Sequence, residues 1–124
     1  MELDESTIKS LDLVYNYTTK SAAIGTLFGV LNKTKTPMGN KYLRQQILQP
    51  LGNIDEIQKR LSFISELVEN KPLLDSIQKE LCGVSNIDAI MNRIALNRAN
   101  PRDLIQLKNS LISIQSVYSI IQEK

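Results

Sequence analysis

The chain has 124 residues, of which 42% are hydrophobic and 23% charged, a composition typical of one folded domain and not of a disordered segment. Its net charge of +2 is too small to predict nucleic-acid binding by itself. A single cysteine excludes an internal disulfide, no apolar run reaches the ~20 residues of a membrane helix, and the polar N-terminal sequence has no signal-peptide core, so we expect a cytoplasmic protein.

The first part of the chain is predicted to form two short helical elements joined by a loop. Asp4 can cap a short helix within residues 3–16. Residues 15–23 are polar and small and are predicted to form a loop, and residues 25–31 form a short apolar element that ends at Asn32. Alternation with period two is weak and confined to residues 11–14, so no strand is predicted.

The next helix is predicted to begin at Thr36 and Pro37. The threonine hydroxyl can accept a backbone N–H, and the fixed φ of proline suits the first helical position. Apolar residues then recur with helical spacing, at Met38, Tyr42, Leu43 and Ile47. Pro50 disfavours helical geometry at Gln49, so the helix should end there.

Three further helix starts follow in the middle of the chain. Asn53 and Glu56 form a capping box, and Asn70 is expected to begin another helix, with Gly83 as the residue that follows its end. Ser85 is expected to begin a third. The apolar stripes of these three helices are Ile54, Ile57, Leu61, Ile64 and Val68; Leu74, Ile77 and Leu81; and Ile87, Ile90, Met91 and Ile94.

A long helix is predicted from Asn100 to the end of the sequence. Asn100, Pro101 and Asp103 supply an N-cap, a proline at the first position and an acid at the third. Apolar residues step three and four apart in a heptad-like stripe, Leu104, Leu107, Leu111, Ile114, Tyr118 and Ile121, which Ile105, Ile112, Val117 and Ile120 widen. The fold predicted is therefore all-α, an irregular helical bundle with a long C-terminal helix.

Residues for catalysis are lacking in this sequence. It has no histidine and one cysteine, which excludes catalytic triads, Cys–His pairs and ordinary zinc sites. No glycine precedes a lysine, so there is no Walker A phosphate loop. Asp55 and Glu56 are adjacent and point in different directions on a helix, which suits capping and not acid–base catalysis. We predict no catalytic, cofactor-binding or metal-binding residue, and no enzyme activity of this chain alone.

Basic residues form two clusters that could contact DNA phosphates. The first cluster is Lys33, Lys35, Lys41 and Arg44, and the second cluster is Arg93, Arg98 and Arg102. Two other interpretations remain open: a solvated helix face, and arginines that pair with Asp88 or Asp103. Cys82, beside Gly83, is expected to be a small buried group at a helix end.

Short motifs recur along nearly the whole chain in a fixed order. They are Asp4-x-x-Thr7-x-x-Ser10-Leu-Asp-Leu13, Gly25-Thr-Leu27, Leu31-Asn-Lys-Thr34, Thr36-Pro-Met-Gly39, Pro50-Leu51, Ile57-x-x-Arg60-Leu61, Glu66-Leu67, Ile87-Asp88, Arg93-Ile94 and Ala99-Asn-Pro-Arg-Asp-Leu104. The ordered set resembles the MutS family of DNA mismatch-recognition ATPases, in the central helical core or lever domain. Ser10, Lys41 and Gln46 depart from the asparagine, arginine and tryptophan usual in that family.

The resemblance implies that residues 1–124 are a fragment, the N-terminal part of domain III before the clamp insertion. The family's mismatch-reading Phe-x-Glu motif and Walker A motif lie in other domains, and neither motif is present here. The segment would then be a non-catalytic lever that links the ATPase to the DNA clamp, with the helix from Pro101 as the main element. ATP and Mg²⁺ would bind elsewhere in a full-length homodimer, and mismatched duplex DNA would have little direct contact with this segment. Other MutS domains are expected partners, and a membrane is not.

Two alternatives stay open. One is a MutS-like protein without mismatch reading, which would serve recombination or ribosome rescue. The other is a free-standing helical interaction module that uses the stripe from Leu104 to Ile121 to bind a partner. Flanking sequence would separate them, because a Walker A motif downstream would identify an ATPase and a Phe-x-Glu motif upstream would favour mismatch recognition.

Overall fold

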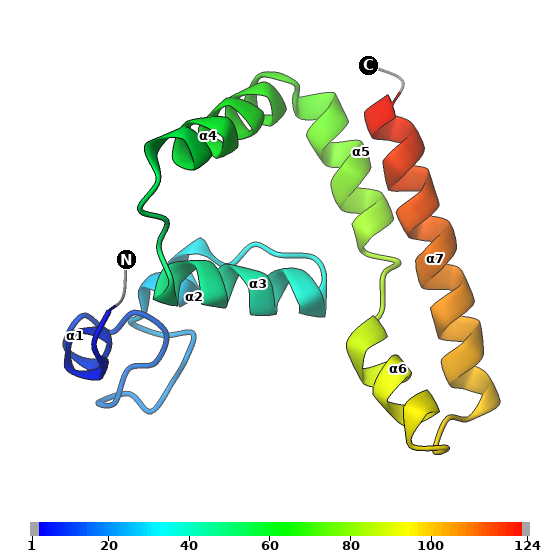
Figure 1. The fold of residues 1–124 in the computed structure, drawn as a ribbon, viewed down its shortest axis with the longest axis horizontal. Coiled ribbons are helices and arrows are strands. Elements are labelled where there is room, and N and C mark those ends of the chain that lie inside the picture. The colour runs from blue at the N-terminus through cyan, green and yellow to red at the C-terminus, as the bar shows by residue number, and fades with distance from the viewer. Residues whose placement is uncertain (1–2, 123–124) are drawn as a thin grey trace. The chain divides into compact units, whose positions relative to one another are not determined.

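The computed structural model describes residues 3–122, and within that range the chain is all-α, as predicted (Figure 1). The helices are α1 (Glu5–Ser10), α2 (Leu27–Leu31), α3 (Pro37–Leu48), α4 (Ile54–Glu69), α5 (Lys71–Leu81), α6 (Ile87–Ala95) and the long α7 (Pro101–Gln122). The only β pairing in the described range is an isolated antiparallel bridge between Asn16 and Ser21. None of its helices is long and apolar enough to span a membrane.

Side-chain caps begin most of these helices where the sequence predicted them. The Asp4 carboxylate accepts the Thr7 N–H at 2.9 Å, and the Asn70 side chain accepts the Leu73 N–H at 3.2 Å. Asn53 Oδ1 likewise accepts the N–H groups of the first turn of α4. Each of these bonds satisfies a backbone donor that has no partner inside its own helix.

The predicted start of α6 at Ser85 is wrong by one residue. Asn86 is the N-cap, and its side chain accepts the Ala89 N–H at 3.0 Å. Ser85 cannot fill this position because its backbone N–H is bonded to Ser110 on α7 instead. The connection before α6 is therefore fixed by a tertiary contact that the local sequence does not reveal.

The chain divides into two compact units. The first unit comprises Met1–Thr34 and Gly39–Ser62, and the second unit comprises Lys35–Met38 and Phe63–Lys124. The first unit has a small core of Leu13, Val14 and Phe28, against which Leu3, Ile8, Leu43, Ile47 and Leu48 are partly buried. The segment with weak alternation, residues 11–14, contributes to this core without forming a strand.

The loop before α2 is held closely against the start of that helix. Thr26 is 2% exposed, and its hydroxyl donates to the Ala22 carbonyl at 2.7 Å and accepts the Gly29 N–H at 2.9 Å. A Cβ on Gly29 would overlap the Ala23 carbonyl oxygen and lie 2.9 Å from the Ala23 Cα. Space against the loop, and not backbone conformation, therefore requires glycine at position 29.

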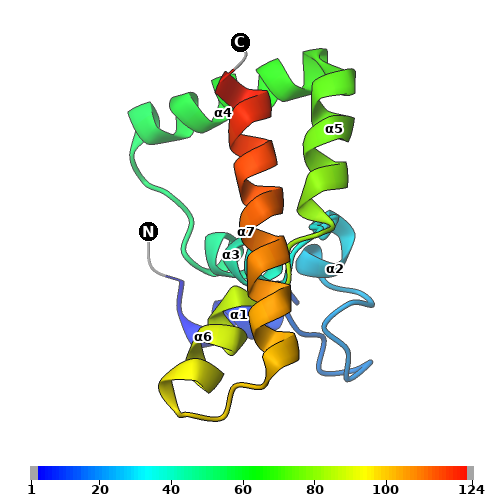
Figure 2. The ribbon, with the colours of Figure 1, turned by 90° about the vertical axis from the view of Figure 1, so that its right-hand side faces the viewer.

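In the second unit α7 packs against α5 and α6 (Figures 1 and 2). Its buried or half-buried residues are Asp103, Leu107, Ser110, Ser113, Ser116, Val117 and Ile120. The prediction that the apolar stripe forms the packed face is wrong for most of its members, since Leu104, Leu111 and Tyr118 are 55%, 55% and 60% exposed. The packed face is rotated toward a row that contains an aspartate and serines, because polar contacts with α6 and its preceding loop fix the helix there.

Two other apolar groups are also more exposed than the sequence suggested. The apolar stripe of α4 is exposed along its length, from Ile54 at 70% to Val68 at 68%. Cys82 is exposed as well, because it is the C-cap of α5 and lies at the surface. Its predicted burial is therefore wrong, and α4 presents an apolar face that the described residues leave uncovered.

Replacing Gly29 with alanine tests the close approach in the first unit. Helix propensity alone would make Gly29→Ala stabilising by about 1 kcal/mol. The overlap with Ala23 reverses the sign, and we expect the free energy of unfolding to fall by roughly 1–3 kcal/mol in urea denaturation.

The control for this substitution is its neighbour Val30, which is 72% exposed. Val30→Ala should change the free energy of unfolding by no more than about 0.5 kcal/mol. A stabilised Gly29→Ala chain would show that the loop yields easily, and the interpretation of Gly29 would be wrong.

Candidate functional site

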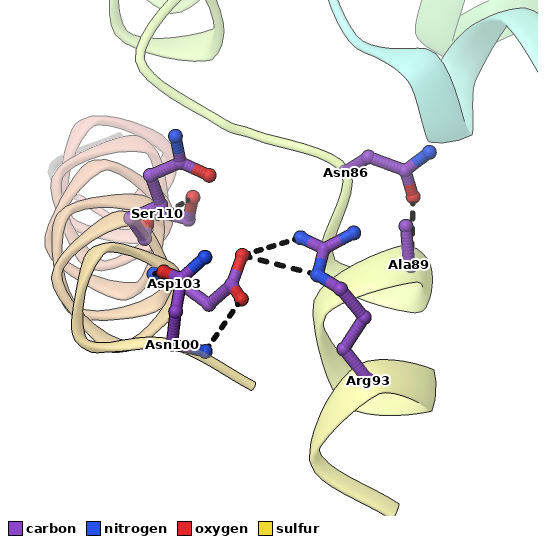
Figure 3. A network of polar contacts seen from close by, with 7 residues as sticks. Asn86, Ala89, Arg93, Asn100, Asp103 and Ser110 are labelled. Carbon is purple, nitrogen blue, oxygen red and sulfur yellow. Dashed lines mark hydrogen bonds and ion pairs between the residues drawn. The ribbon is translucent and has the colours of Figure 1, made fainter. Parts of the chain in front are cut away.

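The junction of α6 and α7 contains a buried ion pair between Arg93 and Asp103 (Figure 3). The Arg93 Nε and Nη2 groups both donate to Asp103 Oδ1, at 3.1 and 2.6 Å. Asp103 is only 5% exposed, whereas the Arg93 side chain is 42% exposed. The guanidinium therefore reaches from α6 across to a carboxylate that is largely removed from water.

The second oxygen of Asp103 caps α7. Asp103 Oδ2 accepts the Asn100 N–H at 3.0 Å, and Asn100 Oδ1 accepts the Asp103 N–H at 3.0 Å. This reciprocal cap confirms the helix start predicted from Asn100, Pro101 and Asp103. The carboxylate also lies at the N-terminus of α7, where the helix dipole favours negative charge. One side chain thus fixes both the start of α7 and its contact with α6.

These bonds stabilise the charged form of both partners. The hydrogen bonds from Arg93, and then the backbone bond from Asn100, hold the pKa of Asp103 below its ordinary value of 3.8, against the opposing effect of burial. The same contact with Asp103 raises the pKa of Arg93. The pair therefore remains ionised at neutral pH, and its attraction persists as the pH rises.

A second polar contact joins α7 to the connection before α6. Ser110 is fully buried, its hydroxyl accepts the Ser85 N–H at 2.9 Å, and it donates to the Gln106 carbonyl at 2.8 Å. Figure 3 shows Ser110 on α7 together with Asp103. The sequence analysis missed both serines, because neutral residues within helical patterns carry no signal of a distant partner.

The predicted basic residues fall into two structural situations. The exposed ones are Lys33, Lys35, Lys41, Arg44, Arg98 and Arg102. Arg93, in contrast, directs two N–H groups to Asp103, which confirms the alternative interpretation that an arginine pairs with this aspartate. Contact with DNA stays a prediction for all seven residues.

A cluster on α3 and α4 was also missed at the sequence level. Arg60 donates through Nη2 to the Tyr42 hydroxyl at 3.1 Å and through Nη1 to Gln46 Oε1, and its guanidinium lies 6.0 Å from the centre of the Tyr42 ring. Gln46 occupies the position where the resembling family has tryptophan. The departure thus replaces a large apolar group with an acceptor for Arg60.

Metal-binding chemistry has no basis in the described part of the chain. Residues 3–122 contain no group of three or more His, Cys, Asp or Glu side chains placed to hold a metal ion. Their strongest polar arrangement is the Arg93–Asp103 junction, in which the carboxylate is saturated by donors of the chain itself. Such a group can fix helices, and it has no acceptor left for a substrate.

Comparison with known proteins relates residues 6–124 to the family model for MutS domain III. The DNA mismatch repair protein MutS of Petrotoga mobilis is 40% identical over 111 residues, 90% of this chain and 13% of its own length. The proteins of the same name from Fervidobacterium nodosum and Methanosarcina mazei are 38% and 36% identical, over 94% and 100% of this chain. The chain spans only 14% of the length of either.

Replacing Asp103 with asparagine tests the junction through its pH dependence. A carboxyl whose pKa is lowered by folding stabilises the folded state at pH values above its ordinary 3.8, and this contribution is lost as the pH falls below 3.8 toward the lowered pKa. At pH 7 we expect Asp103→Asn to lower the melting temperature by roughly 5 °C or more. The difference from the unsubstituted chain should shrink steadily below pH 4 in thermal melts followed by circular dichroism.

Asp75 on α5 provides a matched control, because it is exposed. Asp75→Asn should leave the melting temperature nearly unchanged at pH 7. A melting-temperature difference for Asp103→Asn that stayed constant from pH 7 to pH 2 would contradict an ionised, stabilising Asp103.

Proposed function

The chain belongs to the MutS family as a segment of domain III, and on that premise we propose that it is a helical lever inside a mismatch-recognition ATPase. In this proposal it binds no nucleotide and performs no catalysis. It transmits the state of an ATPase domain to a DNA clamp and the state of the clamp back to the ATPase. ATP with Mg²⁺, a homodimeric assembly, mismatched duplex DNA and a cytoplasmic location are proposed for the full-length protein.

The observation that carries the proposal is the anchored long helix. α7 is a continuous helix of 22 residues, and at about 1.5 Å per residue it extends ~33 Å. Asp103 fixes its first turn to α6 through Arg93. A stiff element held at one end can carry a displacement over this distance, which mechanical coupling between remote sites requires.

The exposed apolar faces support contact with other parts of a MutS protein. Leu104, Ile105, Leu111, Ile112 and Tyr118 on α7 are each more than half exposed. Together with the exposed stripe of α4 they form more uncovered apolar surface than a single helix face usually presents to water. We propose that other domains of the full-length protein cover these faces.

The same exposed stripe favours a second candidate, the free-standing helical module that binds a partner helix. The two candidates predict different coding sequence downstream of this segment. A reading frame that continues into a Walker A motif supports the lever, and its absence would favour the module. A MutS-like protein for recombination or ribosome rescue would share the lever and lack a Phe-x-Glu motif upstream.

Softening α7 tests the lever in the full-length protein. Asn109 and Gln115 are exposed on this helix, and replacing both with glycine should make the helix less stable by about 1 kcal/mol at each position relative to alanine. This is comparable to a typical coupling free energy of about 1–3 kcal/mol. We expect the double glycine variant to lose most of the factor by which ATP changes the Kd for mismatched DNA, measured by fluorescence anisotropy.

The double alanine variant at the same positions is the control, and it should keep that factor within about twofold, since alanine favours helix. Both variants should bind mismatched DNA without ATP as the unsubstituted protein does. If the glycine variant retained the full ATP effect, α7 would not be the coupling element.

The basic clusters are tested by salt titration. We expect the isolated chain to bind duplex DNA weakly and without preference for a mismatch. In the full-length protein, glutamine in place of Lys33, Lys35, Lys41 and Arg44, or of Arg98 and Arg102, should change the salt dependence of DNA binding by less than one phosphate contact, a slope of about 0.9 in log Kd against log salt. A larger decrease in slope for either variant would assign direct DNA contact to that cluster.

A further inference from the structure

We infer that the connection between α5 and α6, residues 82–86, is a hinge fastened to the middle of α7. The inference rests on the proposed lever function and adds where the lever bends. α6 and the lower part of α7 would move as one block, while α5 pivots against the upper part of α7. Three observations in the second unit lead to this assignment.

The first observation is the fastening itself. The Ser85 N–H donates to the buried Ser110 hydroxyl, which is held in turn by the Gln106 carbonyl of its own helix. Ser110 is seven positions beyond Asp103, about two turns up the helix. Since a buried N–H without a partner is costly, the connection is not free to leave α7 at Ser85. The Arg93–Asp103 pair below and the Ser85–Ser110 bond above thus clamp α6 to α7 at two levels.

The second observation is the close approach at Gly83. A Cβ at this position would overlap the Ser113 hydroxyl oxygen, whereas it would lie 3.5 Å from the Ser113 Cβ. Gly83 follows the C-cap of α5 as predicted, but among the described glycines it is Gly25 that has a positive φ. Gly83 is therefore required by the contact with α7 and not by a left-handed backbone.

The third observation is the change in chemistry above the hinge. Beyond Ser113, α7 has half-buried Val117 and Ile120 on the side that packs within the second unit, and α5 has half-buried Leu73, Leu74 and Ile77. Aliphatic contacts are non-directional, so helices joined by them can shift with little change in energy. Polar contacts of fixed geometry occur below the hinge, at Asp103 and Ser110, which makes the lower block the rigid part.

The test uses paired spin labels in the full-length protein with Cys82 replaced by serine. One pair, at exposed Asn92 and Lys108, reports the lower block, and a second pair, at exposed Lys71 and Gln115, reports the contact of α5 with upper α7. Distances are measured without nucleotide, with ADP, and with ATP and a mismatched duplex. We expect one narrow Asn92–Lys108 distance in all states, and a Lys71–Gln115 distance that is broad or shifts by about 2 Å, as helices at shifting interfaces do.

A rescue experiment tests the hinge contact directly. Gly83→Ala should broaden the Asn92–Lys108 distribution, because its methyl group pushes the connection away from Ser113. The double variant Gly83→Ala/Ser113→Ala should restore the narrow distribution, since only the hydroxyl oxygen is in the way, and Ser113→Ala alone should resemble the unsubstituted protein. Failure of the double variant to restore it would overturn the hinge assignment.

The outcomes separate the hinge from the lever. An Asn92–Lys108 distance that changes with nucleotide as much as the Lys71–Gln115 distance would overturn the hinge, even where ATP still alters the Kd for mismatched DNA. A rigid lower block with a mobile α5, in a protein whose DNA affinity does not respond to ATP, would support the hinge and contradict the lever.

Discussion

Asp103 is a carboxylate removed from water, and such a group requires donors for both of its oxygens. Arg93 supplies two donors from α6, and the Asn100 N–H supplies a third at the first turn of α7. Because the three bonds come from different elements, the position of α6 and the start of α7 are determined together. The rotation of α7 about its axis follows from this constraint, since Asp103 must face α6, and with it Ser110 and Ser113 face the same way.

This rotation explains the unusual distribution of side chains on α7. The face within the second unit has an aspartate and serines among its aliphatic residues, while Leu104, Leu111 and Tyr118 remain more than half exposed. A helix that folded only for this segment would be expected to bury its apolar stripe. A segment of a much larger protein has two faces to cover, and in relatives of which this chain spans 13–14% further polypeptide is available to cover the second.

Local chemistry predicted much of the fold, and tertiary contacts decided the rest. The caps at Asp4, Asn53, Asn70 and Asn100 were predictable because each acts within one turn of its helix. The start of α6 was displaced by one residue because Ser85 is bonded to α7, 25 positions away. Periodicity identified the apolar residues of α7, but it could not tell which face meets a neighbour. Of the candidate site, the pairing of Arg93 with Asp103 was foreseen as one of several possibilities, since charge alone does not distinguish a carboxylate partner from a phosphate.

Amide hydrogen exchange of the full-length protein tests the central claim most directly, that the Asp103 junction anchors a helix whose other contacts respond to ligands. The account predicts that the amides of Ser85 and Asp103 keep the same protection without ligand, with ATP, and with mismatched DNA, while protection in the upper half of α7 and along α5 changes between these states. If protection at Ser85 and Asp103 changed first or most strongly, the junction would be the moving part and the account would be contradicted.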